Sequence, residues 1–325
     1  MNSPTNLDAM RLLLSLALLF SLNAYSQVSV QEYPIPRGLF AHDVWADAAP
    51  GGPVYFSAQR SGHLGILDPK SGKVETVALG RGASPHGVVM GPDGAVWLTD
   101  GGQNAIVRVD PRTRQVKTWE LPPDAGYMNL NTATFDGNGV HWFTGQSGIY
   151  GRLDPRTGQM KLFESPKGRG PYGIHHTPDG TVYYASLAGS FVGKINLNGT
   201  ATVIEPPTRG QGARRVWSDS KGNLWVAEWN SGNLSRYEPQ SGKWAQWKAP
   251  GDSPKVYAVY VDEADKVWAS EWSAQVMLRF DPATQRFESF KSSSSSANVR
   301  QIHGRKGEVW TPESGADKLV VYRYK

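Results

Sequence analysis

The sequence contains no cysteine among its 325 residues. Without cysteine there is neither a disulfide framework nor a lipid-modified thiol to hold the chain on a membrane. Long apolar runs are also missing, since a spanning helix takes about 20 residues and the best candidate is Leu12 to Leu22. That run follows Arg11 and precedes the small residues Ala24 and Ser26. The pattern predicts a signal peptide over residues 1–26, and we expect a secreted or periplasmic protein with no membrane partner.

Clusters of basic residues are scarce, although the formal net charge is +5. The lysines and arginines are scattered through predicted turns, whereas nucleic-acid binding needs a basic stripe with stacking aromatics. We therefore expect no nucleic-acid partner. The sequence also contains no GxSxG elbow, P-loop, HExxH helix or EF-hand loop. These absences argue against the common hydrolase, nucleotide and calcium sites.

What the chain does contain is a repeated aromatic residue that opens a strand just after a Gly- or Asp-marked turn. The seven marker aromatics are Tyr55, Trp97, Trp142, Tyr183, Trp225, Trp268 and Trp310. By their numbering they are 41 to 45 residues apart, and a four-stranded propeller blade takes roughly 40–45 residues. The period predicts seven blades.

The second repeat shows how one blade is built. Residues 85–90 and 95–100 form two strands around a Gly-Pro-Asp-Gly turn, and residues 105–109 and 115–120 form two more after Gly/Asn and Asp-Pro turns. Four short strands separated by such turns make one antiparallel sheet. The chain therefore predicts an all-β fold, a seven-bladed β-propeller of four-stranded antiparallel blades.

The last repeat ends at residues 319–324, which is only its third strand. Residues 30–36 resemble the fourth strands of other repeats, so we expect this N-terminal strand to pair with the C-terminal blade. Such pairing closes the ring without an open sheet edge. We expect one propeller domain over residues 27–325 and a monomer.

The first strand of each propeller blade lines the axial channel, and its entry residue faces the mouth where ligands bind. Counting back from each marker aromatic gives one such residue in every blade. The predicted ring is His42, His86, Asn131, Tyr172, Arg214, Tyr257 and Arg300. Polar groups are costly in a buried core, so the ring predicts a wet binding pocket. The alternative is an inert channel whose residues bond one another and water.

A second recurring position, three residues after the marker, holds Asp100, Glu228, Glu271 and Glu313. The third strands carry bases such as Arg108 and Arg236, so ion pairs are the simplest expectation. Glu313 is the metal candidate because Val320 and Val321 stand where other blades carry a base. The remaining histidines match no metal spacing, and we expect them to be structural or solvated: His63, His141, His175, His176 and His303.

The repeat combines Pro-(His/Tyr)-Gly, Gly-Pro-Asp-Gly, Trp-x-(Thr/Ala)-(Glu/Asp) and an Ile-x-Arg strand. Residues 85–109, 171–195 and 223–237 carry this pattern best. It resembles the virginiamycin B lyase (streptogramin lyase) family of seven-bladed propellers over essentially the whole chain after the leader. The resemblance implies that the protein opens a cyclic depsipeptide antibiotic by elimination at its ester, with magnesium, a histidine base and glutamates at the channel mouth.

The chain departs from that family at the residues that carry the chemistry. The family places its base in a Glu-Pro-His-Gly segment of the last blade, where this chain has Asn-Val-Arg-Gln with Arg300. Only Glu313 has a counterpart, shifted by one position. Since arginine stays cationic, proton abstraction would fall to His86 or His42, with Tyr257 or Tyr172 as donor.

Three function classes follow from these residues. The first is a carbon–oxygen lyase that opens an ester in a cyclic or lactone-type small molecule, with Asn131, Tyr172, Arg214 and Arg300 binding the substrate. The second is a noncatalytic propeller that binds an anionic small molecule, favoured by Arg214, Arg215 and Arg300 in place of the histidines that the resemblance implies. The third is a scaffold for a protein partner. Magnesium is expected from the resemblance alone.

Overall fold

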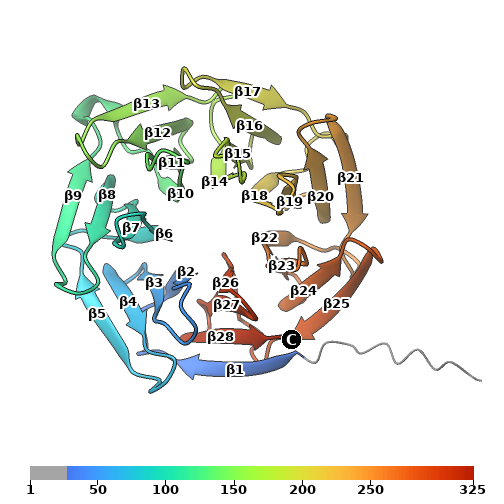
Figure 1. Cartoon of the computed structure of the whole chain (residues 1–325), viewed down its shortest axis with the longest axis horizontal. Helices are drawn as coiled ribbons and strands as arrows, with labels where there is room; N and C mark the ends of the chain where they lie inside the picture. Colours follow the sequence, from blue (N-terminus) through green and yellow to red (C-terminus); the bar gives the residue numbers. More distant parts are fainter. Residues whose placement is uncertain (1–27) are drawn as a thin grey trace, which may run out of the picture.

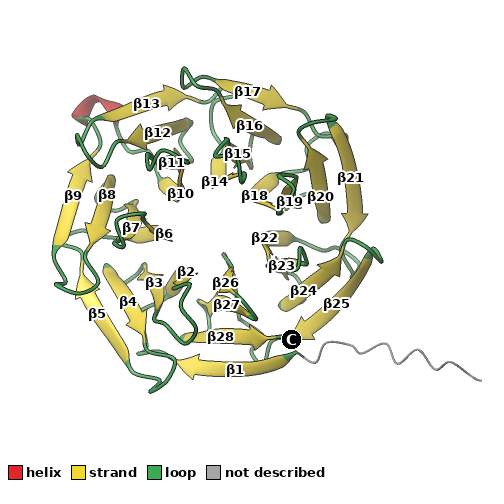
Figure 2. Cartoon of the chain, in the orientation of Figure 1, coloured by secondary structure: helices red, strands yellow, loops and turns green. Residues whose placement is uncertain are grey.

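Seven four-stranded antiparallel sheets form a closed ring around a central axis (Figure 1). The structure is a computed structural model that describes residues 28–325, and the predicted signal peptide lies outside the described residues. Strands and turns make up nearly all of this range, apart from a short 3-10 helix at Pro123–Ala125 (Figure 2). Within it, no helix has the length and apolar character to cross a membrane. The predicted fold class is confirmed.

Each blade runs from an inner strand at the axis to an outer strand at the rim (Figure 1). In chain order the blades are β2 (Ala41–Ala46), β3 (Val54–Ala58), β4 (His63–Leu67), β5 (Val74–Ala78); β6 (Pro85–Met90), β7 (Val96–Asp100), β8 (Ala105–Val109), β9 (Val116–Glu120); β10 (Leu130–Phe135), β11 (His141–Gly145), β12 (Ile149–Leu153), β13 (Met160–Glu164); β14 (Pro171–His176), β15 (Val182–Ser186), β16 (Phe191–Ile195), β17 (Ala201–Ile204); β18 (Ala213–Ser218), β19 (Leu224–Glu228), β20 (Asn233–Glu238), β21 (Lys243–Lys248); β22 (Val256–Val261), β23 (Val267–Glu271), β24 (Val276–Asp281), β25 (Arg286–Lys291); and β26 (His303–Arg305), β27 (Glu308–Glu313), β28 (Lys318–Arg323) with β1 (Ser29–Pro34).

The N-terminal strand closes the ring as the outer strand of blade seven. β1 pairs antiparallel with β28 over its whole length, from Ser29 opposite Arg323 to Pro34 opposite Lys318. Tyr33 of β1 is buried, and its ring lies 5.3 Å from that of Trp310. Its hydroxyl donates to the Pro69 carbonyl of blade one. The predicted closure is therefore present, and β1 also contacts the next blade.

The hydrophobic core is divided among the contacts between blades. Buried apolar residues form seven clusters, and six of them each join two neighbouring sheets. The seventh joins blades six and seven and also contains Tyr172 of blade four. Trp97 of blade two, for example, shares a cluster with Phe143 of blade three. Away from the axis, a blade thus buries its apolar faces against its neighbours, as expected of a repeat architecture.

The marker tryptophans are buried, and each satisfies its indole N–H with a nearby carboxylate. Trp142 donates to Asp136 at 2.9 Å, and Trp268 donates to Asp262 at 2.8 Å. The same aspartates accept backbone N–H groups of their turns. A buried indole N–H needs a partner. In these two blades one aspartate accepts both the indole N–H and the backbone N–H of its turn.

The prediction that second-strand carboxylates form ion pairs with third-strand bases is wrong for Asp100, Glu228 and Glu271. Asp100 and Glu271 accept loop backbone N–H groups, as in the 2.7 Å bond from Lys255 N to Glu271. Glu228 accepts from Ser231, Ser235 and Gln246. The bases lie opposite the marker aromatics instead, because the hairpin register places them there.

Replacing Tyr33 with alanine tests the ring closure. The change leaves a cavity beside Trp310 and removes the bond to Pro69, so we expect a loss of about 3–5 kcal/mol in unfolding free energy by urea denaturation. The matched control is Tyr127→Ala, because Tyr127 is exposed and should change stability by no more than about 0.5 kcal/mol. Equal effects of the two changes would contradict the role of β1.

His141 is buried between Trp97 and Phe135, and neither ring nitrogen has a hydrogen-bond partner. Burial lowers its pKa to about 3. Between pH 6.5 and pH 3 the unfolded chain therefore binds a proton at His141 that the folded chain does not bind. The free energy of unfolding falls as the pH falls through this range. We expect His141→Leu to reduce the stability lost between pH 7 and pH 5 by about 2 kcal/mol. Urea denaturation at both pH values measures this, and an unchanged loss would contradict it.

Candidate functional site

The predicted ring residues lie where the inner strands begin, and six of the seven are in a β-bulge. In blade two, His86 and Gly87 together oppose the single residue Thr99 of β7. Register shifts occur at the same point in β2, β10, β14, β18 and β22. A bulge bends the strand and redirects its side chains. The seventh residue, Arg300, precedes β26.

Two of these bulges contain glycine because neighbouring inner strands approach closely there. A Cβ on Gly87 would lie 2.7 Å from the Asn131 carbonyl oxygen. A Cβ on Gly173 would lie 2.6 Å from the Cα of Arg215. No other residue fits without moving backbone. The glycines therefore let side chains from successive blades meet at the axis.

A buried ion pair crosses the axis from blade one to blade five. An Nη atom of Arg215 lies 3.0 and 3.2 Å from the two carboxylate oxygens of Asp43. The Nδ1 atom of His42 lies 2.8 Å from Asp43. Because a carboxylate only accepts, His42 carries its proton on Nδ1, and Nε2 keeps the lone pair. All three side chains are buried.

The second imidazole is held from blade three. The Nδ2 atom of Asn131 lies 3.2 Å from Nε2 of His86, and the Thr132 hydroxyl donates to the side-chain Oδ1 of Asn131 at 2.7 Å. Arg215 in turn donates to Thr132 at 2.6 Å. If Asn131 donates to Nε2, the proton of His86 is on Nδ1, which is buried without a partner. The centroids of the His42 and His86 rings are 4.0 Å apart. The polar network that starts at His42 therefore ends beside it.

Tyrosines and an arginine from blades four to six form the adjoining wall. The hydroxyls of Tyr172 and Tyr257 are 2.6 Å apart, and Arg214 donates to Tyr172 at 3.1 Å. The guanidinium carbon of Arg214 lies 3.5 Å from the Tyr257 ring centroid and 4.4 Å from that of Trp229. Both tyrosines are buried, whereas Arg214 and Trp229 are partly exposed.

Arg300 completes this wall from blade seven. Its guanidinium carbon lies 4.8 Å from the Trp272 ring centroid and 5.6 Å from that of Phe40. Its Nε donates to Ser314 at 3.3 Å. Arg300, Trp272 and Phe40 are all partly exposed. A ligand entering the mouth therefore meets a cationic and aromatic surface above the buried network.

The two imidazoles are neutral at pH 7. Burial lowers the pKa of His42 well below 6.5, and the charges of Arg300, Arg215 and Arg214 lower it further. Burial likewise lowers the pKa of His86, with His42 adding to the effect and Asp43 opposing it. Both rings can therefore accept a proton at neutral pH.

The tyrosine pair is polarised by the same arginines. Burial and the neighbouring Tyr257 raise the pKa of Tyr172 to about 12, against the opposing charges of Arg214 and Arg215. Burial would also raise the pKa of Tyr257, but Arg214 and Arg215 outweigh it and lower that pKa below 10. Tyr257 is thus the more acidic member, suited to donating a proton.

All seven predicted ring residues thus lie around one axial site, as does Arg215, which the sequence grouped with the arginines that favour an anionic ligand. Other members were missed. Asp43 and Thr132 each follow a ring residue, and sequence alone does not show that a bulge turns both neighbours inward. Trp229 and Trp272 follow the carboxylates of blades five and six in matching Glu-Trp pairs. That repeated pair was the available signal.

Glu313, the predicted metal ligand, does not belong to this site. It was chosen because no base was expected opposite it, and that expectation is wrong. Lys318 lies opposite it in the register and 3.3 Å from its carboxylate, and Ser292 donates to it at 2.7 Å. At the axis, ligand atoms of His42, Asp43 and His86 lie within 4.8 Å of one another. Magnesium prefers an all-oxygen shell, whereas this set offers two nitrogens and a carboxylate already bound to Arg215. These three residues therefore do not fit magnesium.

The other histidines predicted to be structural are held in packing or backbone contacts. His303 accepts from the Ala46 N–H at 3.1 Å and stacks on Trp45 with ring centroids 3.6 Å apart. His175 stacks on Trp217 at 3.8 Å. These rings lie three residues further along the inner strands than the ring position, deeper in the channel.

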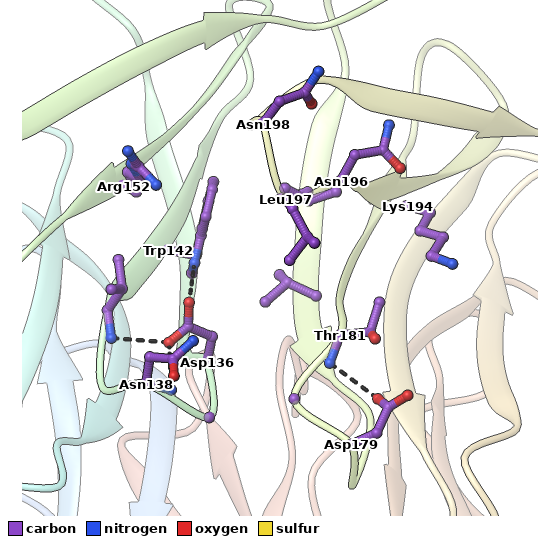
Figure 3. A pocket seen from close by; sticks show the side chains of 15 residues that line it. Asp136, Asn138, Trp142, Arg152, Asp179, Thr181, Lys194, Asn196, Leu197 and Asn198 are labelled. Atoms are coloured by element: carbon purple, nitrogen blue, oxygen red, sulfur yellow. Dashed lines mark hydrogen bonds between the residues drawn. The ribbon is translucent and has the colours of Figure 1, made fainter.

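A separate cavity of about 1010 Å³ opens between blades three and four, away from the axial residues (Figure 3). Asp136 and Asp179 on its walls belong to hairpin turns. Asp136 is bonded to Trp142 and Asp179 to the Thr181 N–H. Its carboxylates thus already serve the fold, whereas the axis holds the buried, unpartnered Nδ1 of His86 and two imidazoles whose pKa values are lowered well below 6.5. We take the axis as the candidate site.

Comparison with known proteins gives consistent results. The family model of the virginiamycin B lyase family matches residues 24–245. The virginiamycin B lyase of Staphylococcus aureus has a TM-score of 0.83 at 20% identity, covering 91% of this chain and 99% of that one. A streptogramin B lyase structure gives 0.83 at 19% identity over 92% and 98%. At such identities the likeness shows the shared fold.

One curated relative, a gluconolactonase of Zymomonas mobilis, is 41% identical over 54 residues. That match spans 16% of this chain and only 15% of the gluconolactonase. A local match of this size carries no whole-protein activity. The family model, in contrast, covers more than half of this chain, and the chain therefore belongs to the virginiamycin B lyase family.

Proposed function

We propose that the protein is a carbon–oxygen lyase that opens an ester in a cyclic or lactone-type small molecule at the axial site. The single observation that carries this proposal is the His42–Asp43 pair at the channel mouth, beside two guanidinium groups. A carboxylate that orients an imidazole and leaves its Nε2 lone pair free is the arrangement of a general base.

In the proposed reaction, Nε2 of His42 takes a proton from the carbon next to a carbonyl. The electron pair of that C–H bond forms a carbon–carbon double bond, and the neighbouring C–O bond of the ester breaks. Its electrons leave with the oxygen as a carboxylate. No water is consumed, so an opened ring has the mass of the closed one.

Other residues would stabilise the charge that develops. Removal of the proton places negative charge on the carbonyl oxygen, and preorganised donors lower the barrier to such a step. The unpartnered Nδ1–H of His86, whose ring lies 4.0 Å from that of His42, and the hydroxyl of Tyr257 would supply such donors. Asn131 holds His86, and Arg214 holds the tyrosine pair through Tyr172.

A second candidate is a noncatalytic propeller that binds an anionic small molecule. The observation in its favour is that Arg214 and Arg300 form no ion pair within residues 28–325. Both candidates use the same pocket, and only a product separates them.

The known family structures include a catalytically inactive histidine-to-alanine variant of the Staphylococcus aureus enzyme with quinupristin.

The direct test is a product assay with cyclic depsipeptides and lactones. Elimination gives a product of unchanged mass with a new double bond, whereas hydrolysis adds one water. We expect His42→Ala to lower kcat about 10²- to 10⁴-fold, with a marked loss also in Asp43→Asn. His63→Ala, in blade one but bonded to the Ser61 carbonyl, is the matched control. Full turnover by both His42→Ala and His86→Ala would contradict the proposal.

The pH profile gives an independent prediction. Because burial and three arginines lower the pKa of His42, the base stays unprotonated below pH 6.5. We expect kcat/KM to hold as the pH falls through 6.5 and to decline only at lower pH. Removing one cation in Arg300→Gln should move this acid limb to higher pH. An acid limb above 6.5 in the wild type would contradict the assignment.

A further inference from the structure

Two of the three arginines at the axis lack the partner that the third one has. Arg215 is paired with Asp43. Arg214 and Arg300 donate only to hydroxyl groups, those of Tyr172 and Ser314, and neither has a carboxylate within ion-pair distance among residues 28–325. A guanidinium carries five N–H donors. Most of those donors at the mouth are therefore available to an incoming group.

Arg214 is held in place by rings rather than by charge. Its guanidinium carbon lies 3.5 Å from the Tyr257 ring centroid and 4.4 Å from that of Trp229. Its Nε is buried without a hydrogen-bond partner. Stacking fixes the plane of the guanidinium while its edge stays open, which prepares it for a planar anion.

The aromatic rings of this wall continue from Arg214 to Arg300. Trp229 and Trp272 have centroids 6.0 Å apart, and Tyr257 stacks on Trp272 at 5.2 Å. Arg300 lies over Trp272. Both tryptophans are partly exposed, so the wall offers ring faces as well as cations. Aromatic pairs in offset or edge contact add to simple burial.

We propose that Arg214 and Arg300 form a subsite for a carboxylate carried on a planar aromatic ring, with the ring packed against Trp229 and Trp272. The inference rests on the proposed function in one respect: this carboxylate is the group that the ester would release. The binding itself needs no turnover. It belongs to this chain's own arginines, which stand where the family pattern has other residues.

Occupancy of the subsite is linked to the base. His42 faces Asp43 on its own strand, His86 from blade two, Arg214 and Arg215 from blade five and Arg300 from blade seven. A carboxylate that neutralises the guanidinium charges makes a proton on His42 less unfavourable. Linkage then requires that the anion bind more tightly as the pH falls.

Calorimetric titration of the mature protein with benzoate, benzamide and acetate tests the subsite. We expect benzoate to bind, benzamide to bind at least about tenfold more weakly for lack of charge, and acetate to bind more weakly for lack of a ring. Arg300→Gln and Arg214→Gln should each weaken benzoate about 10- to 100-fold. Arg112→Gln, an exposed arginine in a blade-two turn, is the matched control and should bind as the wild type does.

Three outcomes would overturn the subsite: no benzoate binding, equal binding of benzoate and benzamide, or benzoate binding that both axial variants retain. Arg300→Lys, which keeps the charge, should recover part of the affinity and so separates charge from altered folding. Benzoate binding without any turnover would refute the lyase while leaving the subsite intact. Turnover without benzoate binding would refute the subsite alone.

Discussion

The buried ion pair between Asp43 and Arg215 is the interaction on which the axial site depends. It joins the first and fifth blades across the channel, fixes the tautomer of His42 and, through Thr132 and Asn131, positions His86. Buried charges are tolerated when they are paired and further hydrogen bonded. Removing either partner would leave an uncompensated charge in the centre of the ring.

That interaction is possible only because the ring closes. The two residues are 172 positions apart in the chain, and pairing of β1 with β28 brings the first blade against the seventh. The apolar clusters between blades carry the stability of the ring, which frees the axis to hold polar groups. Tyr172 and Tyr257 serve both, because the apolar cluster of blades six and seven contains them.

Much of this architecture could be predicted from periodicity. The marker tryptophans recur because each indole N–H needs a carboxylate near its turn and the same packing between blades, so their spacing reports the blade directly. One inner-strand position per blade then locates His42, His86 and Arg300 at the mouth. Their partners Asp43 and Thr132 could not be predicted, because a bulge breaks the alternation that assigns neighbouring residues to opposite faces.

The wrong predictions come from register and from competing donors. Glu313 was compared with Val320 and Val321, whereas the antiparallel register places Lys318 opposite it. Asp100 and Glu271 were expected to bind arginines, but loop N–H groups at 2.7 to 2.9 Å are nearer and need partners too. Sequence identifies which side chains are charged, while turn geometry decides what they bind.

The central claim is that His42 is a neutral imidazole with its proton on Nδ1 and an open Nε2. Nitrogen-15 NMR of the histidine-labelled protein at pH 7, with His42 assigned by its loss in His42→Ala, measures this directly. The account predicts a protonated Nδ1 and an unprotonated Nε2. An imidazolium, or a proton on Nε2 alone, would contradict it.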